Sequence, residues 1–161
     1  NKIMKIVNII IYTFVLLIFT GCGFKTLDQA KLKKFNILEI KDSGDKKINF
    51  FIKNELYNLF NTTNPSEDLI IYVKTDKNKT IKEKNKNNKI TKYNIEINSL
   101  IELKFINKKI TKKINLNIKD FYNVNKNHSI TQNNQKNVEQ NLNDKLSQDL
   151  SNKILKLINE L

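Results

Sequence analysis

The chain has 161 residues and few of the side chains on which most enzyme sites depend. It contains one cysteine, one histidine, one proline, three glycines and no tryptophan, and every basic residue is a lysine. A single cysteine excludes a disulfide within the chain and a cysteine-based zinc cluster. A single histidine argues against transition-metal sites and Cys/His nucleophile sites, and three glycines leave no glycine-rich phosphate loop.

Lysine is what the chain has in abundance, and its formal net charge is +13. A charge of this size attracts phosphate, whether on nucleic acid or on anionic lipid. A codon bias toward lysine and asparagine would place the same charge on any solvated surface, so the surplus permits an acidic partner without identifying one. Hydrophobic residues make up 39% and charged residues 28%, a balance that predicts one folded domain.

The strongest signal lies at the N-terminus, where Lys2 and Lys5 precede an apolar run over residues 6–19. A basic start, an apolar segment and small residues before a cleavage site are typical of a secretory signal. A transmembrane anchor is the competing interpretation, but it needs about 20 apolar residues. We therefore expect residues 1–21 to be a lipoprotein signal peptide that is removed.

The cysteine that follows this segment distinguishes lipidation from plain secretion. The sequence Phe19-Thr20-Gly21-Cys22 resembles the bacterial lipobox, which implies cleavage before Cys22 and a covalent lipid on its sulfur. A buried or free thiol is the alternative, but it gives no reason for this position. Glycine rather than aspartate follows Cys22, which by the same resemblance favours the outer membrane. We expect a protein anchored in the inner leaflet on the periplasmic side, with no cofactor besides the lipid.

Hydrophobic periodicity organises the rest into a lipidated tether, residues 22–34, and one domain, residues 35–161. Spacings of three and four predict helices, and alternation of apolar and polar residues predicts strands, broken only at Ser99 and Leu100. The predicted order is strand, helix, three strands and helix, at residues 35–40, 48–60, 69–73, 93–105, 110–118 and 142–161.

An amphipathic sheet and two amphipathic helices can all bury their apolar surfaces when both helices cover the apolar sheet face. The sequence therefore predicts an α+β fold, with a four-stranded, mostly antiparallel sheet and two amphipathic helices packed on one face. The last helix is expected to be about 30 Å long. Residues 74–92 are predicted to be a strand end plus a solvated loop, and residues 124–135 a polar loop.

Candidates for catalysis are weak. His128 falls in the predicted polar loop, where a solvated side chain is the favoured interpretation. Glu96 and Glu102 share the polar side of one predicted strand, but six residues separate them by about 20 Å. That spacing exceeds the 6.5–9.5 Å or so at which paired carboxylates work even in inverting glycosidases. We predict that the protein is not an enzyme and, because export removes it from the cytoplasm, that it binds no nucleic acid.

Two lysine clusters are candidates for contact with a phosphorylated partner. Lys108, Lys109, Lys112 and Lys113 gather at the predicted hairpin, and further lysines lie between residues 77 and 89. Such clusters are usually solvated turns. The alternative hypothesis is that the four hairpin lysines contact the phosphates of lipopolysaccharide.

The order of elements and several short motifs resemble the LptE family of lipopolysaccharide-assembly lipoproteins, in particular its alphaproteobacterial branch. The motifs are Gly21-Cys22-Gly23-Phe24 at the mature start, Thr91-Lys92-Tyr93 opening the long strand, and Phe121-Tyr122-Asn123 after the last strand. Departures are the absence of a proline after Phe24 and of a small-aromatic pattern near His128.

This resemblance implies a non-catalytic partner of the outer-membrane β-barrel LptD that helps to assemble the barrel and deliver lipopolysaccharide to the outer leaflet. The main alternative is a periplasmic lipoprotein that scaffolds other envelope or cell-wall machinery. An exported hydrolase that uses carboxylates alone is the third and weakest interpretation.

Overall fold

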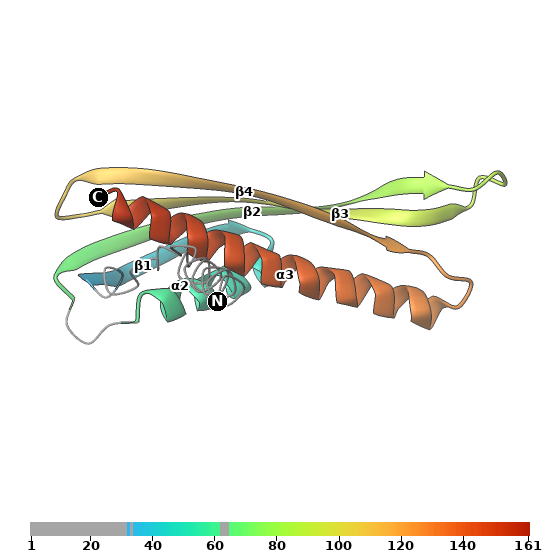
Figure 1. The fold of residues 1–161 in the computed structure, drawn as a ribbon, viewed down its shortest axis with the longest axis horizontal. Helices are drawn as coiled ribbons and strands as arrows, with labels where there is room; N and C mark the ends of the chain where they lie inside the picture. Colours follow the sequence, from blue (N-terminus) through green and yellow to red (C-terminus); the bar gives the residue numbers. More distant parts are fainter. Residues whose placement is uncertain (1–31, 33, 62–64) are drawn as a thin grey trace, which may run out of the picture.

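The computed structural model describes residue 32, residues 34–61 and residues 65–161. The predicted signal peptide and Cys22 lie outside these residues. The elements are four strands and two helices in the order β1, α2, β2, β3, β4 and α3 (Figure 1). Their bounds are β1 Phe35–Gly44, α2 Lys46–Leu59, β2 Glu67–Lys84, β3 Ile90–Phe105, β4 Ile110–Asn123 and α3 His128–Asn159.

The strands form one sheet in the order β1-β2-β3-β4. Strand β1 is parallel to β2 because helix α2 carries the chain back between them, and the other two pairs are antiparallel. Strand β1 runs longer than predicted and ends at Gly44, where φ is +98° and a Cβ atom would lie 1.7 Å from the Thr75 carbonyl oxygen. The close approach therefore requires glycine. Asp45 then caps α2 by accepting a hydrogen bond from the Ile48 amide at 2.9 Å.

Both helices cover the same face of the sheet, as Figure 1 shows, and the apolar core lies between the two layers. This arrangement confirms the predicted α+β fold with a mostly antiparallel sheet. The core includes an aromatic cluster in which Phe35 of β1 contacts Phe60, at the end of α2, and Phe105, at the end of β3, edge to face. Among the described residues, neither helix combines the length and apolar content needed to cross a membrane.

Helix α3 is much longer than predicted. It has 32 residues, about 48 Å, and begins at His128. The prediction of a loop over residues 124–135 is wrong from His128 onward. The side chain of Asn127 caps the helix by accepting from the Ser129 amide, and the first turns are held by polar contacts rather than by an apolar stripe. The buried residues begin at Leu142 and include Leu155, whereas Leu161, the last residue of the predicted helix, lies beyond the end of α3 and is exposed.

Residues 74–92 were predicted to be a long strand end plus a solvated loop, and the strand takes most of this stretch, because β2 continues to Lys84 and pairs with β3 along this length. A tight turn closes the hairpin, in which Asn85 accepts from the amides of Asn87 and Lys89. Strand β4 ends opposite Lys92, so the hairpin projects beyond it as a two-stranded arm. Cross-strand backbone bonds hold this polar segment extended, which side-chain periodicity did not indicate.

Strand β3 is continuous through the point where the sequence pattern breaks. The side chain of Ser99 points inward and is buried, and that of Leu100 points outward. Side chains of the strand thus continue to alternate between the two faces of the sheet, but here the polar residue points inward and the apolar residue points outward. Ser99 lies opposite Thr75, whose hydroxyl donates to the buried Asn49 side chain of α2 at 2.6 Å.

Candidate interaction surface

The sheet face opposite the helices, here called the open face, is not covered by any other element of the described residues (Figure 1). Side chains from all four strands cross it in rows set by the strand register. One row is Lys41, Tyr72, Glu102 and Lys113, the next is Ser43, Lys74, Leu100 and Asn115, and the third is Asp76, Asn98 and Asn117.

Polar contacts link the side chains of neighbouring strands on the open face. The Asn117 amide donates to Glu96 and to Asn98, each at 2.5 Å. Glu102 forms an ion pair with Lys113 at 2.7 Å. Glu96 and Glu102, the two carboxylates weighed for catalysis, are therefore engaged with different partners on β4.

The structure separates the four hairpin lysines that the sequence places together. Lys108 lies 3.5 Å from Glu67 and Lys113 pairs with Glu102, whereas Lys109 occupies the turn with φ of 54°. Lys112 and Lys113 are consecutive on β4 and so project to opposite sides of the sheet. All four remain candidates for a phosphate contact, but they do not converge on one point.

The second lysine group divides into two parts. Lys77 and Lys79 point toward α3, Lys82 lies at the base of the projecting arm, and the lysines beyond it lie on the arm. The ammonium of Lys82 lies 3.4 Å from the centroid of the exposed Phe121 ring. Lys92 pairs with Glu83 and, by donating a hydrogen bond, lowers the pKa of that carboxyl group. The arm is therefore a basic projection with an aromatic residue at its base.

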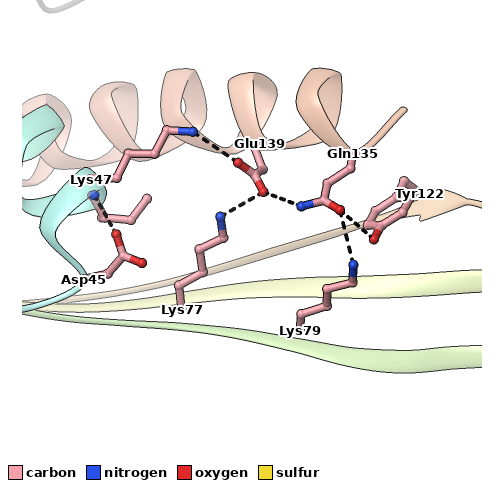
Figure 2. A network of polar contacts seen from close by, with 8 residues as sticks. Asp45, Lys47, Lys77, Lys79, Tyr122, Gln135 and Glu139 are labelled. Atoms are coloured by element: carbon pink, nitrogen blue, oxygen red, sulfur yellow. Dashed lines mark hydrogen bonds and ion pairs between the residues drawn. The ribbon is translucent and has the colours of Figure 1, made fainter. Parts of the chain in front are cut away.

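A polar network ties the first half of α3 to the sheet, as Figure 2 shows. The side-chain oxygen of Gln135 accepts from the Tyr122 hydroxyl at 2.9 Å and from Lys79 at 3.2 Å. The amide of Gln135 donates to Glu139 at 2.9 Å. Tyr122 in turn stacks on Tyr93, with ring centroids 5.6 Å apart. Sequence analysis missed this network because residues 128–135 were assigned to a loop; the spacing of four between Gln135 and Glu139 was the available signal.

Glu139 is the centre of this network. It pairs with Lys77 of β2 at 2.8 Å and with Lys47 of α2 at 3.3 Å, so it joins three elements. Burial alone would raise the pKa of Glu139, but the hydrogen bonds and positive charge outweigh it and lower the pKa to about 2. The carboxylate is therefore ionised over the whole physiological pH range, and its ion pairs hold α3 to β2 and α2.

The remaining site candidates give little chemistry. His128 is exposed at the first residue of α3. Among residues 34–61 and 65–161, no three histidine, cysteine or acidic side chains gather in a way that would hold a metal ion. Cys22, the expected lipidation site, lies outside the described residues.

No protein-family model and no curated protein matches the chain by sequence. Solved structures do share its fold. Rare lipoprotein B from Shewanella oneidensis superposes with a TM-score of 0.50 at 9% identity, covering 76% of this chain and 94% of that one. A Caulobacter crescentus lipoprotein gives 0.52 at 7% identity, with 81% and 94% covered. Lipoprotein B from Nitrosomonas europaea gives 0.55 at 10% identity, with 84% and 92% covered.

Proposed function

We propose, from the premise that this chain has the rare lipoprotein B fold, that it is an outer-membrane lipoprotein anchored by lipid on Cys22. In this proposal it partners an LptD-like β-barrel in assembling and delivering lipopolysaccharide to the outer leaflet, without a catalytic step. The observation that supports the proposal most strongly is the fold shared with three lipoproteins over most of each chain.

The open face is suited to this role. Its asparagines, lysines and paired carboxylates form a polar surface, and the inner wall of a large outer-membrane barrel is polar and hydrated. Contact between two such surfaces needs no large apolar interface. The helix-covered face, by contrast, is already buried within the domain.

Purification from detergent-solubilised native membranes tests the partnership. A stoichiometric large β-barrel that co-purifies with the affinity-tagged protein is the expected result. Its absence would favour the rival role, a periplasmic lipoprotein that scaffolds other envelope or cell-wall machinery. Mass spectrometry of the purified protein should find the chain beginning at Cys22 with its sulfur acylated; an unmodified sulfur would overturn the anchor.

Lipopolysaccharide contact is tested by changing the four hairpin lysines, Lys108, Lys109, Lys112 and Lys113, to glutamine. If these lysines contact phosphate, the loss of four exposed ion contacts of about 0.2–1 kcal/mol each should weaken lipopolysaccharide binding by about fourfold or more. The matched control makes the same change at four exposed lysines outside both clusters, Lys126, Lys136, Lys145 and Lys156. Binding that is equal in the wild type and the hairpin variant would reject the assignment.

A further inference from the structure

The open face is hollowed at its centre. Two adjoining depressions of about 320 Å³ and about 350 Å³ share Lys74 and Leu100 in their linings. We call the two together the trough. It extends over three rows of side chains, about 13 Å along the strands, and over the width of the four-stranded sheet, about 14 Å.

The alternation of apolar and polar residues in β3 is interrupted at the floor of this trough. A half-buried strand normally places the apolar side chain inward and the polar one outward, but Ser99 points inward and Leu100 outward. The Ser99 hydroxyl is buried and has no hydrogen-bond partner among the described residues. If the two side chains were exchanged, the serine hydroxyl would reach solvent and the leucine would be buried. The observed arrangement therefore weakens the fold locally. Such departures from local consistency are expected where a surface has a binding role.

The lining combines a small apolar floor with dense hydrogen-bonding groups. Tyr72, which is 37% exposed, and Leu100 supply the apolar surface. Around them stand hydroxyl, amide, ammonium and carboxylate groups, which together donate and accept hydrogen bonds in every direction. These polar lining residues include Ser43, Asp76, Asn98, Asn115 and Asn117.

The charge of the trough argues against phosphate as its ligand. Two lysines, Lys41 and Lys74, stand beside two carboxylates, those of Asp76 and Glu102. The carboxylate of Asp42 points to the opposite face of the sheet, where it pairs with Lys53 of α2. A dense anion would meet as much repulsion as attraction here, unlike on the lysine-rich arm.

We propose that the trough binds an uncharged glycan chain. A sugar ring presents an apolar C–H face, which fits over Tyr72 and Leu100, and a rim of hydroxyls, which the surrounding amides and carboxylates can both donate to and accept from. The location of the protein, and hence the source of the glycan, rests on the proposed function. The neutral outer-core hexoses of lipopolysaccharide and the N-acetylglucosamine units of the cell-wall glycan share this chemistry.

The chain contains no tryptophan, so a single introduced tryptophan would be its only source of indole fluorescence. The variant Tyr72→Trp places a single indole in the trough. The mature lipoprotein is titrated in a polyoxyethylene detergent, because a glycoside detergent would itself present sugars. Three probes are used: an oligosaccharide of neutral hexoses that represents the outer core of lipopolysaccharide, an N-acetylglucosamine oligomer that represents the cell-wall backbone, and inorganic phosphate.

A saturable change in indole fluorescence with at least one glycan, and none with phosphate, is expected; which glycan acts identifies the source. Adding Leu100→Asn, which suits an outward position, should weaken the response at least tenfold. Adding Ile70→Asn, an outward apolar residue on the same face outside the trough, should leave it unchanged.

Three results would overturn the proposal: no response to either glycan, an equal response to phosphate, or an undiminished response in the Leu100→Asn variant. These results are independent of barrel co-purification. A glycan response without a barrel would retain the trough and reject the proposed partner.

Discussion

The two halves of helix α3 rest on the same sheet through different chemistry. From Leu142 onward the helix buries a stripe of apolar residues, several of them fully. Before Leu142 it buries none completely, and it is held by Gln135, Glu139 and the lysines and tyrosine that contact them. A helix can therefore be fixed along a sheet well beyond its apolar core, but by contacts that depend on geometry and ionisation rather than on buried area.

The largest expected difference between the halves comes from truncating an apolar side chain in each. Leu146 is completely buried, so Leu146→Ala should lower the free energy of unfolding by about 2–5 kcal/mol. Ile130, on the first half, is 44% exposed, and Ile130→Ala should change it by less than about 0.5 kcal/mol. Urea unfolding followed by circular dichroism measures both. Equal losses would show that the halves are not distinct.

The next effect concerns the ionised centre of the first half. Glu139→Gln removes the carboxylate partner of Lys77 and Lys47 and should cost about 1–3 kcal/mol at neutral pH. The same measurement on Glu160→Gln, an exposed carboxylate at the far end of α3, provides the control. A loss no greater than that of the control would mean that the network contributes little.

The pH dependence of this difference follows from the pKa of Glu139. The pKa is about 2 in the folded protein and near its ordinary value of 4.5 when unfolded, so the unfolded state binds more protons between these limits. The stabilisation is therefore complete above about pH 5 and is lost as the pH falls toward 2. The stability curves of wild type and Glu139→Gln should converge over this window, and parallel curves would contradict the assignment.

The smallest effect tests whether the first half can loosen alone. Gln135→Ala removes the acceptor for Tyr122 and Lys79 and should lower overall stability by about 1 kcal/mol or less. Amide hydrogen exchange should nevertheless accelerate over residues 128–141 and stay unchanged over residues 142–159. Gln132→Ala, at an exposed position on the same helix, is the matched control. Uniform acceleration along α3 would show that it behaves as one unit.

This contrast also explains which parts of the fold the sequence could predict. Apolar periodicity identified α2, the second half of α3 and the central strands, because burial imposes that periodicity. It missed the first half of α3 and the arm of β2, which are held by the Gln135 and Glu139 contacts and by backbone pairing with β3. Neither interaction leaves a hydrophobic pattern in the sequence.

The candidate surface was predictable only in outline. Alternation in residues 93–105 indicated a polar sheet face, and the Ser99-Leu100 irregularity was visible in the sequence. The structural role of this irregularity could not be predicted, because the trough forms only when the strand register places Leu100 between Lys74 and Asn115. Likewise, the spacing of Lys112 and Lys113 suggested one cluster, and only the strand geometry sends them to opposite sides.

The sixteen residues of β3 make the domain unusually long for its mass. At strand spacing they extend over about 50 Å, with hairpin lysines at one end and arm lysines at the other. The two lysine groups are therefore too far apart for one compact ligand to contact both at once, and a single partner that reaches both must itself be extended along the strands.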